Sequence, residues 1–344
     1  MRRIILSCLL LGLCLAGMAQ EETKYYLPRT AVKLKLLIEK TTYTPGEFNQ
    51  YAERFLKMER GGETVCTYRI MNVKVSTEGV ADPDKEYIAK TDPKRNIQSV
   101  NLADDGVLLS INTEPRKAEK PAPFIPAPKA APLNAREFMS QEILSAGSKA
   151  KMAELTAQEI YDIRESKIML AKGQADYMPK DGEQLRIMLR QLNAQEAALL
   201  QMFEGTTVCD TLEHVITLLP KEETNHMLLF RFSKHFGMTD IDDFSGEPYY
   251  LTVEDLHTTP TIQVAAEPGK KDKNGDAIYV NLPGKIRITL SHQDQPLVSQ
   301  ELFAAQFGRV EMLDGNLFSK KLETSIVLNP ATGNLESIKT EVLK

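Results

Sequence analysis

Two patterns of apolar and polar residues follow one another along the chain, one typical of strands and one typical of helices. From Thr30 to Tyr43 apolar and polar residues largely alternate, which predicts a half-buried strand. Its apolar face comprises Val32, Leu34, Leu36 and Ile38. Residues 65–113 carry shorter alternations broken by turn signals, and from Gly205 onward the pattern is strand-like again. Both stretches therefore predict antiparallel strands, with Asn274-Gly275 as a hairpin turn.

Four segments carry the start signal of a helix. Thr44-Pro45-Gly46-Glu47 fits a capping box and predicts a short helix packed on a sheet. Further helices are predicted to start at Asn134, Thr156 and Asp181, each followed three residues later by Glu or Gln. The last one carries an apolar stripe of Leu185, Met188, Leu189, Leu192, Leu199 and Phe203. We expect the last two helices to form an antiparallel hairpin with this stripe in its core.

A proline-rich stretch separates the first strands from the helices. Its prolines, alanines and lysines indicate an extended spacer, which we favour over a proline-rich ligand for a partner's groove. The predicted fold class is α+β, with two antiparallel β-rich domains and a helical hairpin between them. The expected boundaries are 1–19 for a signal peptide, 20–113 for a β-rich domain with one helix, 114–133 for the linker, 134–204 for the helical region and 205–344 for a β-rich C-terminal domain.

One short pattern occurs twice. Residues 106–114 and 333–341 share Gly-x-Leu-x-Ser-Ile-x-Thr-Glu. A single match in so long a chain does not indicate a duplicated domain. Two similar hairpins, or chance, explain it.

The amino terminus indicates export. Arg2 and Arg3 precede an apolar run from Ile4 to Ala16, followed by small residues at the positions that a signal peptidase reads. The run is shorter than the roughly 20 residues that cross a bilayer as a helix. We expect a mature chain from Gln20, periplasmic or secreted, with no transmembrane helix after signal cleavage.

Charge argues against two classes of partner. The formal net charge is −5, and −7 once Arg2 and Arg3 are removed, with both signs scattered along the chain. Nucleic acid and anionic membrane are therefore poor partners. The partner that remains is an unknown envelope protein or a glycan.

Two cysteines, Cys66 and Cys209, stay in the mature chain. An exported protein can oxidise such a pair, so a disulfide between them is one expectation and two free thiols the other.

The histidines lack the spacing of a metal site. They are His214, His226, His235, His257 and His292. If residues 220–225 close a hairpin, Leu219 lies opposite His226 and His214 opposite Arg231, so the first two histidines are far apart. Asp272, Asn274 and Asp276 match the start of a calcium loop, but Ala277 and Pro283 break the rest of that motif. We expect no metal and no cofactor.

Recognised catalytic motifs are absent from the sequence, including the nucleophile elbow, the zinc-protease helix and the phosphate-binding glycine loop. The acidic cluster that could serve a glycosidase comprises Asp240, Asp242, Asp243 and Glu247. The loop bounded by Gly237 and Gly246, which holds the three aspartates, is equally typical of solvated turns. No catalytic residue is assigned.

Several segments together resemble a known family. They are residues 26–28, 39–46, 51–56, 175–182, 195–200 and 205–207. In this order they resemble the Bacteroidetes family catalogued as domain of unknown function 4831, whose members begin with export signals. The resemblance implies an exported protein and implies no activity.

Our hypothesis is an exported envelope protein with a binding or structural role. The alternative is a secreted hydrolase of glycans or peptides that uses carboxylates of the C-terminal domain. A pocket with paired carboxylates and a raised pKa would favour the hydrolase. A flat surface with a large apolar patch would favour a binding protein.

Export predicts a processed amino terminus. Mass spectrometry of the protein recovered from its exporting host should show a chain that begins at or near Gln20. Protein that retains Met1 and stays in the cytosol would contradict the prediction.

Overall fold

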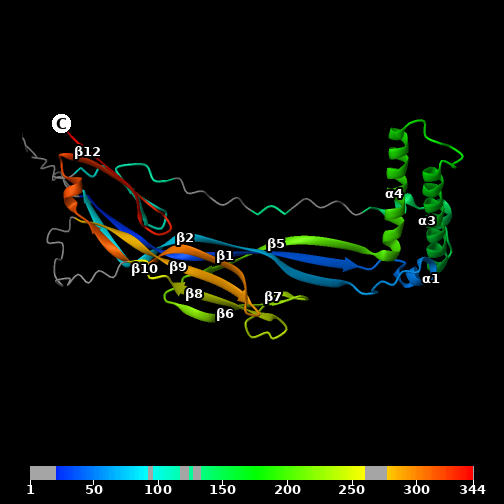
Figure 1. The fold of residues 1–344 in the computed structure, drawn as a ribbon, viewed down its shortest axis with the longest axis horizontal. Coiled ribbons are helices and arrows are strands. Elements are labelled where there is room, and N and C mark those ends of the chain that lie inside the picture. The colour runs from blue at the N-terminus through cyan, green and yellow to red at the C-terminus, as the bar shows by residue number, and fades with distance from the viewer. Residues whose placement is uncertain (1–20, 92–95, 117–123, 127–132, 260–276, 344) are drawn as a thin grey trace, which may run out of the picture.

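The computed structural model describes residues 21–91, 96–116, 124–126, 133–259 and 277–343. The molecule is elongated, with a β body at one end and a helical unit at the other, joined by a long ribbon of strands (Figure 1). Within the described residues the strands form three antiparallel sheets, so the predicted α+β class is confirmed. The expected signal peptide lies outside the described residues.

The ribbon is built on one strand of 24 residues, β1 (Glu21–Thr44). The strand β2 (Val65–Thr91) pairs with one edge of β1 along almost its whole length. The strand β5 (Thr206–Leu218) pairs with the other edge, from Val32 to Thr44. At about 3.3 Å per residue, β1 spans roughly 80 Å.

A five-stranded sheet packs against the inner half of the ribbon. It has the order β10-β9-β8-β6-β7, with β6 at Thr224–Ser233, β7 at Gly237–Thr239, β8 at Glu247–Asp255, β9 at Ile278–His292 and β10 at Gln295–Leu313. The predicted apolar face of β1 forms this core, because Val32, Leu34 and Leu36 are fully buried against Leu251 and Ile288. The predicted alternation in β1 is therefore confirmed.

The third sheet closes the far end of the body. It has the order β12-β11-β4-β3, with β3 at Val100–Leu102, β4 at Leu108–Ile111, β11 at Leu322–Leu328 and β12 at Leu335–Val342. A 3₁₀ helix, η3 (Gly315–Phe318), precedes β11. Tyr25 and Leu27 of β1 share a second core with Ile326 and Phe318.

The strands of the two predicted β-rich segments do not form separate sheets. The ribbon joins β5 to β1 and β2, and the third sheet joins β11 and β12 to β3 and β4. The hairpin considered for residues 212–219 and 226–233 is not formed, because β5 pairs with β1 whereas β6 pairs with β8. His214 consequently lies opposite Leu36 and not opposite Arg231.

The repeated pattern marks two hairpins in one sheet. It falls on β4 and on β12, the second strands of the hairpins β3-β4 and β11-β12. Both strands flank β11 in the same register, since Ile111 and Ile338 lie opposite Ile326. Two similar hairpins thus account for the repeat.

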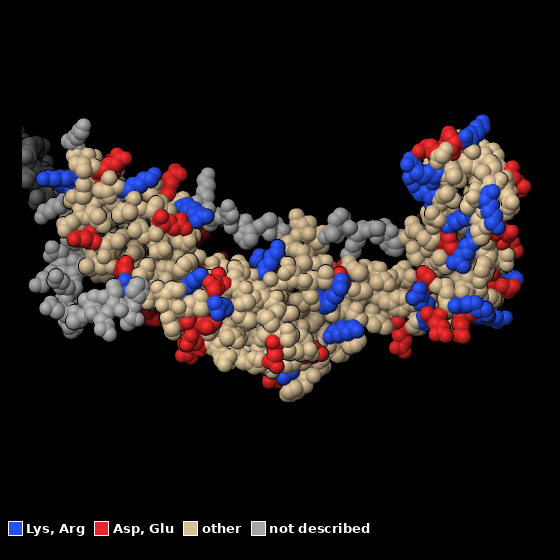
Figure 2. All heavy atoms as spheres, in the orientation of Figure 1, with Lys and Arg blue, Asp and Glu red and all other residues tan. Residues whose placement is uncertain are grey.

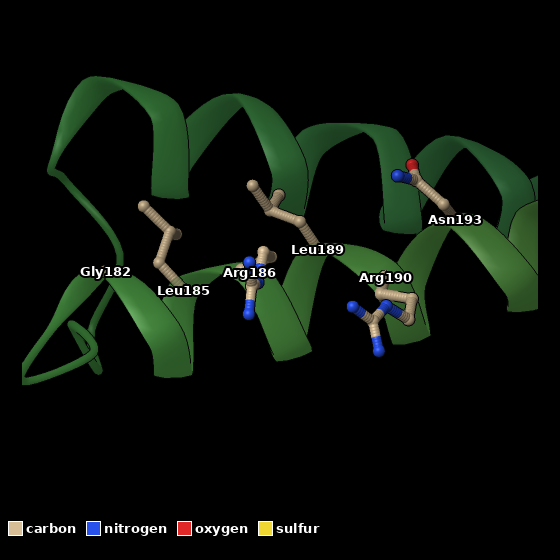
Figure 3. Close-up of a pocket in the computed structure, with 6 residues that line it drawn as sticks. All are labelled: Gly182, Leu185, Arg186, Leu189, Arg190 and Asn193. Carbon is tan, nitrogen blue, oxygen red and sulfur yellow. The ribbon is translucent and has the colours of Figure 1, made fainter.

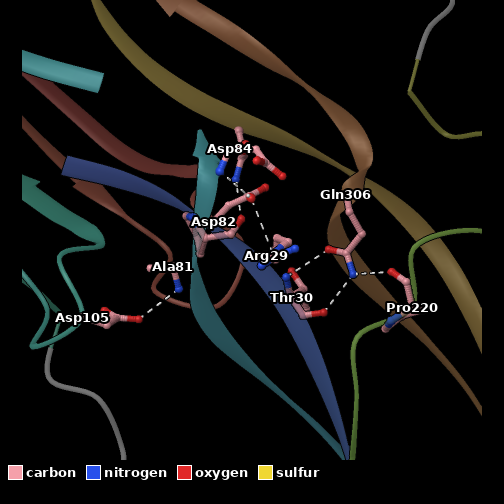
Figure 4. Close-up of polar contacts among 10 residues, drawn as sticks. Arg29, Thr30, Ala81, Asp82, Asp84, Asp105, Pro220 and Gln306 are labelled. Atoms are coloured by element: carbon pink, nitrogen blue, oxygen red, sulfur yellow. Dashed lines mark hydrogen bonds and ion pairs between the residues drawn. The ribbon is translucent and has the colours of Figure 1, made fainter. Parts of the chain in front are cut away.

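The edge of β1 that β5 leaves open is satisfied by other parts of the chain. The Tyr26 N–H donates to the Gly106 carbonyl at 3.0 Å, and the Pro28 carbonyl accepts from the Asn281 amide at 3.0 Å. At Thr30 the side-chain amide of Gln306 accepts from the backbone N–H at 3.0 Å and donates to the carbonyl at 2.9 Å (Figure 4).

Gln306 therefore replaces a strand residue beside β1. Its amide nitrogen also donates to the Pro220 carbonyl at 2.8 Å, just past the end of β5. The buried Thr30 hydroxyl donates to the Ala331 carbonyl at 2.9 Å and accepts from the Ala305 N–H at 3.0 Å. Side by side with these bonds, Arg29 and Asp82 form an ion pair at 3.5 Å (Figure 4).

The helical unit contains short helices and two long ones. They are η1 (Asn49–Tyr51), α1 (Ala52–Leu56), η2 (Ala135–Phe138), α2 (Gln141–Leu144), α3 (Lys149–Lys172) and α4 (Gly182–Glu204). Asn134 and Asp181 cap helices as predicted, and the Asp181 carboxylate accepts from the Gln184 N–H at 2.8 Å.

Two predicted helix starts are wrong. Thr44 still belongs to β1, and the first helix begins at Asn49 and packs on the long helices instead of a sheet. Thr156 lies inside α3, where its buried hydroxyl donates to the Met152 carbonyl, and the cap of that helix is Ser148. In both cases the residue that resembles a helix start lies within a longer element, β1 for Thr44 and α3 for Thr156.

The length of the linker fits the distance it has to cover. The chain leaves the third sheet after β4 and re-enters the helical unit at η2 (Figure 1). The 20 residues of 114–133 reach about 62 Å when extended. The part of β1 between Tyr26, beside Val107, and Thr44 is about 60 Å long. Residues 117–123 and 127–132 of the predicted linker lie outside the described residues, and the spacer interpretation stays a prediction.

Gln306 provides a test of the open edge of β1. Gln306→Met should lower the free energy of unfolding by about 2–3 kcal/mol, because the backbone groups of Thr30 and the Pro220 carbonyl lose their partner. Gln300→Met, on the exposed side of the same strand, should change it by less than about 0.5 kcal/mol. Urea unfolding of both variants measures the difference, and equal effects would contradict the assigned role.

Candidate functional site

The hairpin of α3 and α4 is the exposed feature that the fold holds away from the body (Figure 1). Ser148 caps α3 by accepting from the Lys151 N–H at 3.2 Å. The helix ends at Gly173, whose φ of 69° lets the chain turn into the connector of residues 174–181. The predicted antiparallel hairpin is confirmed, and the two helices pack on each other.

A tight junction fixes the hairpin to the ribbon. A Cβ atom on Gly46 would lie 2.3 Å from the Met202 carbonyl oxygen, so only glycine fits beneath the end of α4. The Phe48 N–H donates to the same carbonyl at 2.6 Å. The Tyr43 hydroxyl, at the end of β1, donates to the Glu204 carbonyl at 2.9 Å. The hairpin therefore has a defined orientation on the ribbon.

The half of the hairpin next to the ribbon has a complete core. Ile160 of α3 and Leu199 and Phe203 of α4 are fully buried there together with Phe48. The rings of Phe48 and Phe203 lie 5.5 Å apart. This half confirms the predicted core position of Leu199 and Phe203.

An ion-pair cluster lies in the middle of the hairpin. The Glu196 carboxylate accepts from Arg164 at 2.6 Å and from Lys167 at 2.5 Å, so it links α4 to α3. Burial acts to raise the pKa of Glu196, but the hydrogen bonds and positive charges of Lys167 and Arg164 outweigh it, and the pKa is lowered. Glu196 is therefore ionised at neutral pH.

The outer half, from this cluster to the connector, leaves apolar side chains uncovered. Tyr177 is 64% exposed, Ile187 is 53% exposed and Ile168 is 50% exposed. Leu185, Met188 and Leu189 are only half-buried, so for these three the expected core position is reached in part. We call residues 162–192 of this half the outer hairpin surface.

One hollow of the outer hairpin surface lies between α3, the connector and α4, with a volume of about 590 Å³. Its floor is apolar and includes Met169, Leu170 and Met188. Carboxylates lie around it, from Asp162, Glu165 and Asp176. A ligand with an apolar side and positive charges fits this chemistry.

A second hollow of about 410 Å³ lies along α4. Leu185 and Leu189 point toward α3, whereas the guanidinium groups of Arg186 and Arg190 point away from it (Figure 3). Positive charges thus border this hollow, in contrast to the acidic surroundings of the first. Figure 2 shows both signs of charge crowded around the helical unit on the face in view.

The outer hairpin surface offers contacts, not reactive groups in a pocket. Its apolar floors suit the burial of a partner's side chains, and the polar groups around them suit orientation of that partner. Sequence reasoning placed Leu185, Met188 and Leu189 in a core. The apolar Ile187, off the stripe, and Tyr177 and Met178 in the connector were the available signals of a second apolar face.

The predicted acidic cluster does not converge. Asp240, Asp242 and Asp243 are exposed in the loop between β7 and β8. Arg231 holds this loop by donating to the Ile241 carbonyl at 2.7 Å and to the Gly246 carbonyl at 3.0 Å. The solvated-turn interpretation describes these residues.

The chemistry of these carboxylates also differs from that of a general acid. Hydrogen bonds from the backbone N–H and the hydroxyl of Ser245 lower the pKa of Asp243, whereas a general acid needs a raised one. Glu247 is held by the His292 ring at 2.6 Å and by the Gln293 amide at 3.3 Å. The hydrolase alternative gains no support from this loop.

The histidines are dispersed over the body. His226 stacks on Tyr250 at 3.9 Å and His292 stacks on Tyr249 at 4.4 Å, and these tyrosines are neighbours on β8. His257 lies 3.2 Å from Asp255, and His214 and His235 lie on β5 and in the turn after β6. Across the part of the chain that the structure describes, no three metal-binding side chains gather. The calcium-like residues Asp272, Asn274 and Asp276 lie outside that part.

Both cysteines are free in the structure, which is the second of the two expectations for this pair. Cys66 on β2 lies opposite Thr42, and Cys209 on β5 lies opposite Thr41, with β1 between them. Two strand spacings separate them by about 10 Å. Since Thr41 and Thr42 point to opposite faces, so do the two thiols, which excludes a bond in this geometry.

Glu196 yields a pH-dependent prediction. Glu196→Gln should lower the free energy of unfolding at pH 7 by about 1 kcal/mol. Because the pKa in the folded state is lowered, the stabilisation is present above the unfolded value of about 4.3 and is lost as pH falls through the folded value.

Glu183→Gln is the matched control, since Glu183 pairs with Arg186 on the exposed face of the same helix. Its effect should stay near zero at every pH. Urea unfolding between pH 3 and 7 compares the variants. A Glu196→Gln effect that persists unchanged at pH 3 would contradict the assignment.

Comparisons with known proteins identify a family and no activity. No curated protein and no solved structure matches the chain. None of the helices that the structure describes has the length and apolar character needed to cross a membrane. The model of a domain of unknown function, DUF4831, matches residues 21–336, nearly the whole described length. The chain therefore belongs to the DUF4831 family.

Proposed function

We propose that this chain is an exported envelope protein of Bacteroidetes with a binding or structural role, and that the outer hairpin surface is where it contacts a partner. The observation that carries the proposal is the half-covered apolar stripe of α4, with Ile187 and Tyr177 beside it. Clustered exposed apolar side chains are typical of interaction sites.

The ribbon supports the same interpretation. It places the hairpin at the end of the molecule, and the junction at Gly46 and Phe48 fixes its orientation. A rigid base with an apolar outer half gives a partner access to the tip from several sides (Figure 1).

The chemistry of the first hollow selects the partner. Its apolar floor suits the apolar row of an amphipathic helix. Asp162, Glu165 and Asp176 suit basic residues beside that row. We therefore propose that the partner is an envelope protein with an amphipathic segment whose lysine or arginine residues flank its apolar face.

Export rests on the sequence. The signal-like residues 2–19 and the resemblance of several segments to an exported family support a periplasmic or secreted location. The scattered charges support a protein partner over nucleic acid.

Site-specific photo-crosslinking in the exporting cells tests the surface. A photoreactive amino acid at Ile187 should give a discrete adduct, because this side chain is exposed beside the half-buried stripe. The same amino acid at Lys149, exposed at the ribbon end of α3, should not.

Adding Met188→Asp to the variant that carries the photoreactive amino acid at Ile187 sharpens the test. It places a charge on the floor of the first hollow and should abolish the adduct without changing the thermal unfolding midpoint by more than a few degrees. Equal adducts at both positions, or an adduct that survives Met188→Asp, would refute the proposed surface.

A further inference from the structure

Strand β12 forms an outer edge of the third sheet, at the end of the molecule opposite the hairpin (Figure 1). It pairs with β11 on one side. All residues from Glu336 to Val342 are exposed. In the part of the chain that the structure describes, no strand pairs with its other edge, which can therefore accept a further strand.

A row of isoleucines runs across the sheet and ends at this edge. Ile111 of β4 and Ile338 of β12 both lie opposite Ile326 of β11. Ile111 and Ile326 are fully buried, whereas Ile338 is 43% exposed. On the same face, Val342 is 74% exposed. An apolar side chain on an added strand would continue the row.

The charges of β12 indicate what that added strand carries. Glu341 lies directly opposite Glu323 of β11, and like charges in that position destabilise a sheet. Lys339 lies opposite Ser325. Among the described residues, neither Glu341 nor Lys339 has an ion-pair partner. A neighbouring strand with a lysine beside Glu341 and a carboxylate beside Lys339 would be complementary.

We propose that the open edge of β12 pairs with β12 of a second copy of this chain, in antiparallel orientation, with Thr340 on the twofold axis. Lys339 of each copy then lies opposite Glu341 of the other. Ile338 of each copy lies opposite Val342 of the other. The two four-stranded sheets become one continuous sheet across the axis. This pairing is independent of the outer hairpin surface.

The register follows from the requirement that both copies keep their apolar face on the same side of the sheet. Directly opposed residues then have positions that are both odd or both even. Centring the axis on Lys339 or Glu341 would oppose two like charges. Centring it on Ile338 would place Lys339 opposite Ser337. Only Thr340 on the axis forms both lysine–glutamate pairs and both isoleucine–valine contacts.

A charge-reversal series tests this pairing. The wild-type protein should be a dimer by light scattering coupled to size exclusion. Lys339→Glu and Glu341→Lys should each raise the dimer dissociation constant roughly tenfold or more, because each opposes like charges twice. The double variant Lys339→Glu/Glu341→Lys should restore the wild-type value, since it exchanges the partners.

A crosslink tests the register independently. With Cys66 and Cys209 changed to Ser, Thr340→Cys should form an intermolecular disulfide on mild oxidation, because the two residues face each other. Ser337→Cys, exposed on the same strand, should not, since it lies about 20 Å from its mate.

Circular dichroism confirms that each variant is folded. A monomeric wild-type protein would overturn the proposal and leave the edge to a strand of another protein. A dimer that is indifferent to the charge reversals, or that the Thr340→Cys variant does not crosslink, would overturn it as well.

Discussion

A strand in the middle of a sheet needs hydrogen-bond partners along both edges, and for β1 this requirement organises the whole molecule. One edge is met by β2 alone. The other edge is met in turn by Gly106, Asn281, Gln306 and β5, which come from four distant parts of the chain. An unpaired backbone group buried there would be costly, so these segments cannot separate from β1 freely. The three sheets meet because one strand requires all of them.

The same strand divides the molecule into ends with different packing. In the body its apolar face is covered by the five-stranded sheet, and at the amino-terminal end its side chains enter the core of the third sheet. At the other end it passes into the helical unit, whose core is built from helices alone. At both ends of the molecule, in the outer half of the hairpin and at β12, apolar side chains are packed on one side only and are partly exposed. The exposed apolar side chains discussed above are concentrated where the layered packing stops.

Sequence patterns predicted the features that depend on neighbouring residues. The alternation of Val32, Leu34 and Leu36, the Asp181 cap and the α+β class are all local signals, and the structure confirms them. Strand partners depend on residues far apart in the chain, so the sequence did not show that β5 pairs with β1. The pairing of Cys66 and Cys209 stayed open for the same reason, because the sequence does not show that β1 separates the two cysteines.

The candidate site was missed for a related reason. The stripe on α4 has the spacing of a core helix. In the half of the hairpin next to the ribbon it does form a core, with Leu199 and Phe203 buried. Whether the apolar side chains of the outer half are covered depends on how far the surrounding short helices extend along the hairpin. Those helices pack near the ribbon, which a periodic pattern along α4 does not reveal.

The direction of the ribbon also determines how the molecule would respond to force. A partner that pulls on the hairpin while the body is held applies tension along β1, β2 and β5. All three strands run from the helical unit toward the body, so they carry that tension side by side, and the hydrogen bonds between them do not open one after another as in a zipper. The long register of β1 with β2 and β5 thus makes the ribbon a tether suited to mechanical load as well as a spacer.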